Sequence, residues 1–196
     1  MKPQIVIFIG RSGSGKGTQA KCLKKYIESK GEDVFHLESG KKFRELIHNT
    51  DSYTSKLATV VNKEGKLQPQ FLSVYIWASE LVSNMNENMN VLIDGTPRRL
   101  EETKVLETAF EFYGRDNIHV ISLGVPEDKA INRLQKRGRE DDKDIEDIEE
   151  RQDWFETDVI PVIDYYRSTD YYHFHEINGV GDIDEIHKNI LKALYD

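Results

Sequence analysis

The feature that most constrains the fold is a glycine-rich turn placed between an apolar segment and a helical pattern. Every residue of Ile5–Ile9 is apolar, as in a strand that is covered on both faces of a sheet. The turn that follows reads Gly10-Arg11-Ser12-Gly13-Ser14-Gly15-Lys16-Gly17-Thr18. Glycines let backbone N–H groups converge on phosphate oxygens, and the N-terminus of the next helix favours the same negative charge. The order of strand, turn and helix therefore predicts a phosphate-binding loop in an α/β protein.

The lysine of this loop places a point charge beside the terminal phosphates of a nucleotide. In the general motif the next residue is Ser or Thr, whose hydroxyl binds Mg²⁺. Here the next residue is Gly17, and Thr18 follows it, so Thr18 is only a candidate metal ligand. The alternative interpretation, a flexible turn with a surface lysine, is disfavoured by the strand and helix patterns on either side.

Length, charge and cysteine content exclude several classes of protein. The 196 residues, 38% of them hydrophobic, suit one compact domain, and the formal net charge of -8 argues against nonspecific nucleic-acid binding. Cys22 is the only cysteine, which rules out an internal disulfide and a thiolate zinc site, so no zinc is expected. The apolar segment at the start is too short for a signal peptide or a membrane span. We therefore expect a cytoplasmic protein without a membrane partner.

Apolar runs alternate with helical patterns along the rest of the chain. Further strand-like runs occupy residues 34–37, 91–93, 118–125 and 171–177. Apolar stripes at helical spacing occupy residues 71–85 and 183–194, the second with Asp182 as a candidate N-cap. Strands separated by helices predict a parallel sheet with helices on both faces, and ligands of such sheets bind at the carboxyl ends of the strands.

Six segments, taken in order, resemble the adenylate kinase and related nucleoside monophosphate kinase family in its short-lid form. They are residues 13–19 (Gly-Ser-Gly-Lys-Gly-Thr-Gln), 36–44 (His-Leu-Glu-Ser-Gly-Lys-Lys-Phe-Arg), 65–69 (Gly-Lys-Leu-Gln-Pro), 94–98 (Asp-Gly-Thr-Pro-Arg), the charged set Arg133, Arg137, Arg139, Asp141, Asp142 and Arg151, and residues 181–186. The resemblance implies a P-loop NTPase three-layer sandwich with a five-stranded parallel sheet, forming a single domain over residues 1–196. It also implies a helical monophosphate-binding insertion at residues 39–68 and a short lid at about residues 137–142.

The resemblance implies reversible transfer of the ATP γ-phosphoryl group to a nucleoside monophosphate, AMP before others, by a monomer. Arginine suits this reaction because its planar guanidinium grips phosphate oxygens bidentately. The implied catalytic residues are Lys16, Arg98, Arg137, Arg139 and Arg151. The implied ATP-binding residues are Gly13, Ser14, Gly15, Lys16, Gly17, Thr18, Arg133 and Gly181. The implied acceptor-binding residues are Ser39, Arg44, Gln68, Gly95, Arg98 and Glu102. Mg²⁺ would accompany ATP, held by Asp94 through water, with Thr18 as a further candidate.

The chain departs from the family pattern around the acceptor base. Residues 38–41 read Glu-Ser-Gly-Lys where the family has Ser-Thr-Gly-Asp; Gln68 replaces a valine, Thr96 an aromatic residue and Glu102 a glutamine. Glutamine donates and accepts, which suits adenine, whereas an ionised glutamate only accepts. Glu102 would suit the two donors of guanine, or a single amino group of adenine or cytosine. Two interpretations stay open: a shifted or relaxed acceptor preference, or an ordinary exposed helix residue beside Glu101 and Lys104.

Two further questions stay open from the sequence. The acidic residues Glu140, Asp141 and Asp142 cannot each be matched to one lid position, because the interval to Arg151 is one residue longer than the family's. The chain could also be a nucleotide-binding module without kinase activity, or a kinase for another small acceptor. The full set of arginines argues against the module, and Arg44 with Arg98 argues for a phosphate on the acceptor.

Overall fold

A five-stranded, wholly parallel sheet forms the centre of the molecule. The computed structural model describes residues 2–49, 51–139, 142 and 144–196. The strands lie in the order β2-β3-β1-β4-β5. Their bounds are β1 (Ile5–Ile9), β2 (Val34–Glu38), β3 (Asn90–Asp94), β4 (Ile118–Gly124) and β5 (His173–Asn178). The predicted five-stranded parallel sheet is confirmed.

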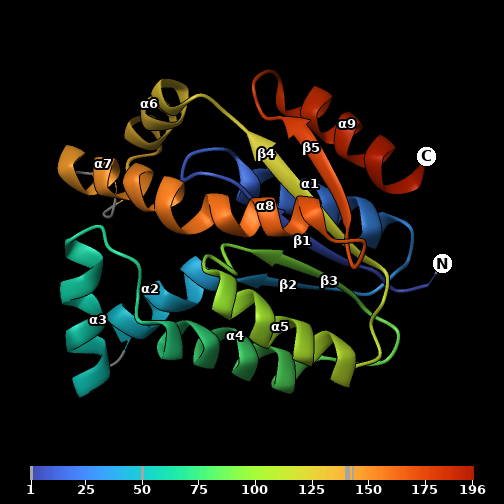
Figure 1. Ribbon diagram of the computed structural model, residues 1–196, viewed down its shortest axis with the longest axis horizontal. Coiled ribbons are helices and arrows are strands. Elements are labelled where there is room, and N and C mark those ends of the chain that lie inside the picture. Colours follow the sequence, from blue (N-terminus) through green and yellow to red (C-terminus); the bar gives the residue numbers. More distant parts are fainter. Residues whose placement is uncertain (1, 50, 140–141, 143) are drawn as a thin grey trace.

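Helices cover both faces of this sheet (Figure 1). The helices α1 (Lys16–Ser29) and α9 (Ile183–Tyr195) pack on one face. The helices α4 (Gln70–Asn84), α5 (Leu100–Phe112) and α8 (Ile160–Ser168) pack on the other. The molecule is therefore the three-layer α/β sandwich that the sequence predicted.

The remaining helices stand beyond the carboxyl ends of the strands, at the left of Figure 1. They are α2 (Ser39–Asn49), α3 (Tyr53–Lys63), α6 (Glu127–Arg137) and α7 (Ile145–Trp154); a π-helical turn, η2 (Phe155–Val159), joins α7 to α8. The helices α2 and α3 fall within the expected insertion at residues 39–68. The expected lid starts at the last residue of α6, but Glu140 and Asp141 lie outside the described residues.

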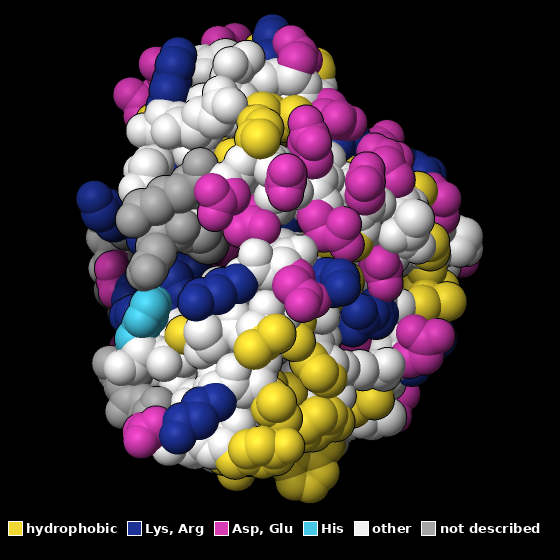
Figure 2. All heavy atoms as spheres, turned by 90° about the vertical axis from the view of Figure 1, so that its left-hand side faces the viewer, with side chains coloured by type: hydrophobic (Ala, Val, Ile, Leu, Met, Phe, Trp, Pro, Cys, Tyr) yellow, Lys and Arg dark blue, Asp and Glu magenta, His cyan; other side chains and the backbone are white. Residues whose placement is uncertain are grey.

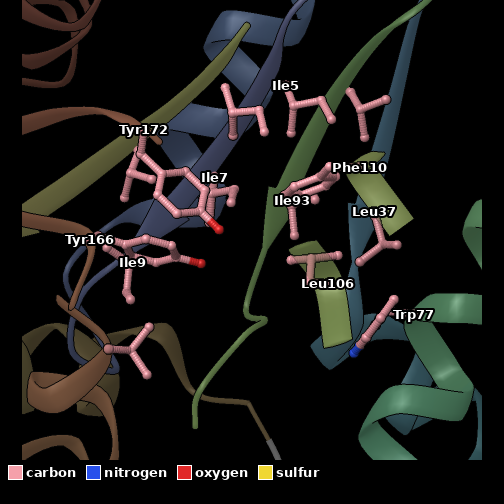
Figure 3. Close-up of a cluster of buried hydrophobic side chains, with 14 of the residues drawn as sticks. Ile5, Ile7, Ile9, Leu37, Trp77, Ile93, Leu106, Phe110, Tyr166 and Tyr172 are labelled. Carbon is pink, nitrogen blue, oxygen red and sulfur yellow. The ribbon is translucent and has the colours of Figure 1, made fainter. Parts of the chain in front are cut away.

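The central strand β1 is buried at every position, with no residue more than 3% exposed. Its odd-numbered residues point toward α4, α5 and α8, where Figure 3 shows Ile5, Ile7 and Ile9 grouped with Ile93 and Tyr166. Its even-numbered residues point toward α1 and α9. A strand covered on both faces has no polar side, which explains the unbroken apolar run.

The last helix begins as its sequence predicts. The Asp182 side chain accepts a hydrogen bond of 2.8 Å from the Asp184 backbone N–H and so caps α9. Its stripe of Ile186, Ile190 and Leu194 is buried against α1 and the sheet. No helix in the described part of the chain is long and apolar enough to cross a bilayer.

Candidate functional site

A cavity of about 640 Å³ opens at the carboxyl ends of the strands. It lies between the glycine-rich loop, α2, the segment after β3 and the arginines of α6 and α7. Figure 2 shows Lys and Arg side chains gathered across the middle of the face that carries α3 and α7. Most of the expected site residues line the cavity: Gly13, Ser14, Gly15, Lys16, Gly17, Thr18, Arg44, Gln68, Asp94, Gly95, Arg98, Arg133, Arg137, Arg139, Arg151 and Gly181. Ser39 and Glu102 do not line it.

The glycine-rich loop depends on two glycines with left-handed backbone conformations. Gly13 has a φ of +86°, and a Cβ at this position would lie 2.4 Å from the carbonyl oxygen of Ala130 on α6. Gly15 has a φ of +101° and is the N-cap of α1. No other residue fits at Gly13, because any side chain would push the loop off α6. The loop is thus held from behind by α6 while its open side faces the cavity.

Lys16 is half-buried beside the loop and folds back on it. Its Nζ donates hydrogen bonds to the carbonyl oxygens of Gly10 at 2.7 Å and Arg11 at 2.9 Å. Burial lowers the pKa of Lys16 to about 8, and the negative charge of Asp94 limits this fall. The ammonium group therefore lacks a full counter-charge inside the site, which is the condition under which an anionic ligand binds most favourably.

Arg133 connects the loop to the segment after β5. Its guanidinium donates to the carbonyl oxygen of Ser14 at 3.2 Å and to that of Gly179 at 2.9 Å. Gly181 lies in the same segment, with a φ of +139°. The expected ATP-binding residues on both sides of the loop are therefore adjacent in space.

Asp142 joins two of the expected catalytic arginines. Its fully buried carboxylate accepts two hydrogen bonds from Arg137, at 2.7 and 2.8 Å, and one from Arg151 at 3.1 Å. Burial alone would raise the pKa of Asp142, but the hydrogen bonds and charges of the two arginines outweigh it and hold the pKa below its ordinary value. Of the three acidic residues left open by the sequence, Asp142 has this role; Glu140 and Asp141 lie outside the described residues.

Two arginines were expected to bind the acceptor monophosphate, and they differ in their contacts with the protein. Arg98 donates from Nε to the carbonyl oxygen of Gly95 at 2.7 Å, and its guanidinium lies 5.0 Å from the ring centroid of Trp154. Among the residues that the structure describes, none gives the guanidinium of Arg44 a hydrogen bond or an ion pair. Gln68 donates from Nε2 to the carbonyl oxygen of Ala58 at 2.9 Å, while its buried Oε1 has no partner in the described part.

Glu102 is not an exposed helix residue, so that interpretation of the sequence is wrong. It is 2% exposed and lies behind the cavity wall. Its Oε1 accepts hydrogen bonds from the hydroxyls of Ser73 and Thr96, and its Oε2 accepts one of 2.8 Å from the Arg98 backbone N–H. All three donors suit a carboxylate, since an ionised carboxylate only accepts. Glu102 therefore positions Arg98 and Thr96 in this structure.

Ser39 also lies behind the wall. Its hydroxyl donates to the Asp94 carbonyl oxygen at 3.3 Å, and a Cβ on Gly95 would come within 2.7 Å of that hydroxyl. Ser39 thus holds the segment after β3 close to the start of α2.

Three side chains at the ends of β2 and β3 could hold a divalent cation. His36, Glu38 and Asp94 each offer a ligand atom, and these atoms lie within 4.8 Å of one another. Glu38 pairs with Asp94 in the register of the two strands. A Cβ on Gly17 would lie 3.0 Å from Asp94 Oδ2, so the glycine leaves this carboxylate room beside the loop. Carboxylate oxygens are the ligands that Mg²⁺ prefers, so the donor set fits the expected metal.

Sequence reasoning missed Glu38 and Arg99 as site residues. Glu38 was noted only as a departure from a pattern, although its place at the end of a strand was a signal. Arg99 lines the cavity and donates to the Gln68 carbonyl oxygen at 3.1 Å and to Asp158 at 3.0 Å. Arg99 lies one residue beyond the segment 94–98, so no sequence pattern pointed to it.

Comparison with known proteins identifies the family of the chain. The family model described as adenylate kinase matches residues 8–171. The chain belongs to the adenylate kinase family. It is 31% identical to an adenylate kinase of Flavobacterium psychrophilum over 193 residues, covering 96% of this chain and 97% of that protein. It is 33% identical to an adenylate kinase of Bacteroides fragilis over 193 residues, covering 97% of each.

One relative of the chain is named as a kinase of other monophosphates. A UMP-CMP kinase of Prunus armeniaca is 33% identical over 190 residues, which cover 96% of this chain and 76% of that protein. The chain is thus a nucleoside monophosphate kinase, and most of its relatives are adenylate kinases. Kinases of this family use ATP with Mg²⁺.

Proposed function

We propose that AMP is the preferred acceptor, so that the protein converts ATP and AMP into two molecules of ADP. The observation that carries this choice is the 31–33% identity, over almost the full chain, to proteins named adenylate kinase. The reaction moves a phosphoryl group between oxygens, so catalysis consists of positioning, charge stabilisation and exclusion of water.

In this proposal the glycine-rich loop holds the phosphates of ATP. Backbone N–H groups of residues 13–18 face the triphosphate, and Lys16 leaves the loop carbonyls to contact its terminal phosphates. Arg133 and Gly181 border the adenine. Supporting this role, Lys16, Arg133 and Gly181 all line the same cavity.

The transferring group lies among three arginines. Arg137 and Arg151 supply charge, and their shared partner Asp142 fixes the planes of both guanidinium groups. Arg139 lines the cavity on the same side. Charged donors fixed before the reaction need little reorganisation in the transition state, which is the main source of electrostatic catalysis.

The acceptor monophosphate lies between Arg44 and Arg98. Arg44 has no partner among the described residues, so its guanidinium is available to an anion. Ser39 and Glu102 act from behind the wall, and Gly95 acts from the wall itself, by positioning Arg98 and the segment after β3. The unpartnered Oε1 of Gln68 is an acceptor suited to an amino group of the base.

The residues that would hold magnesium are Asp94 and Glu38, with Thr18 at the start of α1 as a further ligand. When bound, the cation neutralises charge on the phosphates. The insertion at residues 39–68 and the lid at about residues 137–142 close over the substrates and exclude water, which suppresses hydrolysis of ATP. A monomer is part of this proposal, as the resemblance to the short-lid kinases implies.

A second candidate is a kinase with another acceptor base. It is favoured by the likeness to a UMP-CMP kinase. Both candidates share the phosphate-binding residues and differ only at the base.

The test is diphosphate formation from Mg·ATP with AMP, GMP, CMP, UMP or dAMP. AMP should give the highest kcat/KM. Arg98→Ala should lower it by at least 100-fold, while Arg167→Ala, an exposed arginine paired with Asp164 and Glu176, should leave it unchanged. Preference for another monophosphate would replace AMP with that acceptor. ATP binding without diphosphate from any acceptor would contradict the kinase assignment.

A further inference from the structure

Three histidines lie close together on one face of the sheet, near the amino ends of the strands, opposite the end that carries the candidate active site. His119 is the second residue of β4, and His173 and His175 are the first and third residues of β5. His119 pairs with His173 in the register of the two strands, and His175 is one step further along the same face. None of the three lines the nucleotide cavity.

The ring nitrogens of two of these histidines converge. His119 Nδ1 lies 3.1 Å from His175 Nε2, and the two rings are nearly parallel, with an interplanar angle of 13°. The other nitrogen of His119, Nε2, lies 3.1 Å from Asn117 Oδ1. Because an amide oxygen only accepts, Nε2 carries the proton of His119, and its Nδ1 presents a lone pair toward His175.

The third histidine flanks this pair from the exposed side. The ring centroid of His173 lies 4.8 Å from that of His119, and His173 is exposed to solvent. Burial, followed by the neighbouring imidazoles, lowers the pKa of His119 to about 4, and burial also lowers the pKa of His175. The pair is therefore neutral at pH 7, which is the state in which imidazole binds a metal.

We propose that His119, His175 and His173 form a binding site for a divalent transition-metal ion of the Zn²⁺ class. His119 Nδ1 and His175 Nε2 supply two ligands, and the exposed His173 supplies the third after a side-chain rotation. Two nitrogens at about 2.0–2.1 Å from one tetrahedral zinc are separated by about 3.3 Å, close to the distance found here. When the metal binds, the proton of His175 moves from Nε2 to Nδ1. The metal then replaces the hydrogen bond between His119 and His175, and both imidazoles stay neutral.

Asn117 lies where its side chain can orient a metal-binding histidine. A histidine that binds a metal usually donates its other N–H to an oxygen, which fixes the tautomer and the ring orientation. The bond from His119 Nε2 to Asn117 Oδ1 is already in place. The proposal departs from the expectation of no zinc, which rested on the single cysteine. His119 joins the other two histidines only through strand pairing.

The test is a titration of the nucleotide-free protein with Co²⁺, whose visible spectrum reports its ligands, followed by displacement with Zn²⁺. Excess Mg²⁺ is present throughout, because it prefers oxygen ligands and occupies carboxylate sites. We expect one equivalent of Co²⁺ per chain. His119→Gln and His175→Gln should each weaken binding at least tenfold, and Asn117→Ala should weaken it about 10- to 100-fold.

Two variants serve as matched controls. His48→Gln removes an exposed histidine of α2, and Glu38→Gln disables the other cluster of possible metal ligands. Both should bind Co²⁺ as the wild type does. Binding that survives both His119→Gln and His175→Gln, or that is lost in Glu38→Gln, would overturn the proposal, as would a wild type that binds no Co²⁺.

A measurement on the wild type alone covers the case in which a variant does not fold. The ring ¹⁵N resonances of His119 and His175 should move when Zn²⁺ saturates the protein. Resonances that stay in place at saturating Zn²⁺ would refute the site.

Discussion

Single residues in this molecule have roles that depend on what their neighbours donate. Glu102 shows this most clearly, because its carboxylate receives two hydroxyls and one backbone N–H in a buried place. The family resemblance implies that the residue at position 102 contacts the acceptor base. In this structure the hydrogen bonds of Glu102 go to other protein groups instead.

Replacing Glu102 by glutamine should destabilise the protein. The amide NH₂ would face either the Arg98 backbone N–H, which cannot accept, or the two hydroxyls, which would have to turn and accept. Either arrangement weakens the buried network, so we expect a fall of about 1–3 kcal/mol in the free energy of unfolding. Urea denaturation measures this, with Glu101→Gln, an exposed neighbour, as the control. Unchanged stability of the Glu102 variant together with a changed acceptor preference would assign Glu102 to base recognition instead.

ATP binding should take up a proton above pH 8. The pKa of Lys16 is about 8 in the free protein because the side chain is buried. Bound phosphates favour the charged form, so at pH 9 binding should protonate most Lys16 side chains, and at pH 7.5 far fewer. Calorimetry in buffers of different ionisation enthalpy measures the uptake. Lys16→Arg should show none, since arginine stays charged; equal uptake in this variant would exclude Lys16 as the source.

Pairs of elements determine how the site is assembled. The turn at Gly65 touches α7, where a Cβ on Gly65 would lie 2.8 Å from the Asp147 carbonyl oxygen, and Trp154 donates to the Gly65 carbonyl oxygen at 3.0 Å. This contact fixes the end of the expected insertion against the helix that carries Arg151.

Gly65→Ala should therefore impair use of the acceptor. The clash displaces the insertion, and we expect kcat/KM for the acceptor to fall about 10- to 100-fold, with little change in ATP binding. Gly114→Ala is the matched control, because Gly114 has a φ of +62°, close to the +65° of Gly65, but nothing within 4 Å of an added Cβ. Equal kinetic losses in both variants would show that backbone strain, and not the contact with α7, is responsible.

Asp142 ties α6 to α7 through Arg137 and Arg151. Asp142→Asn should lower stability by about 3 kcal/mol at pH 7, because two buried or half-buried cations lose their counter-charge. The folded pKa of Asp142 is depressed, so its contribution is complete above the unfolded pKa of about 4 and is lost as pH falls through the folded value. Unfolding measured from pH 7 to pH 2 should show the two proteins converging in acid; a constant difference would contradict this.

Elements were easier to predict from the sequence than the contacts between them. The runs at Ile5–Ile9 and residues 118–125 correctly predicted strands, because strands covered on both faces are apolar at most or all positions. The partners of Glu102, Arg99 and Glu38 could not be predicted, because each is held by residues distant in the sequence. Periodicity reports which side of an element is buried and carries no information on which polar groups meet there.

The cavity at the carboxyl ends of the strands is lined by residues from the glycine-rich loop through to α9, so nucleotides should stabilise the molecule as a unit. At 100 times its dissociation constant a ligand adds about 2.7 kcal/mol, which corresponds to a rise in Tm of about 5–10 °C for a chain of this size. Scanning calorimetry with ATP or AMP measures the shift. Arg44→Ala should keep the shift with ATP and lose that with AMP; loss of both would place Arg44 in the ATP site.

The burial of β1 has a consequence for how the molecule fluctuates. This strand is hydrogen-bonded on both sides and ends at Ile9, directly before the glycine-rich loop. Its amides should be among the slowest to exchange with deuterium, since their exposure requires the sheet to come apart. The closure of the insertion that we propose would not require the sheet to come apart. Under the proposed function, entry of substrates and global unfolding would therefore be separate events, and the proposed triphosphate site would begin at the strand that comes apart last.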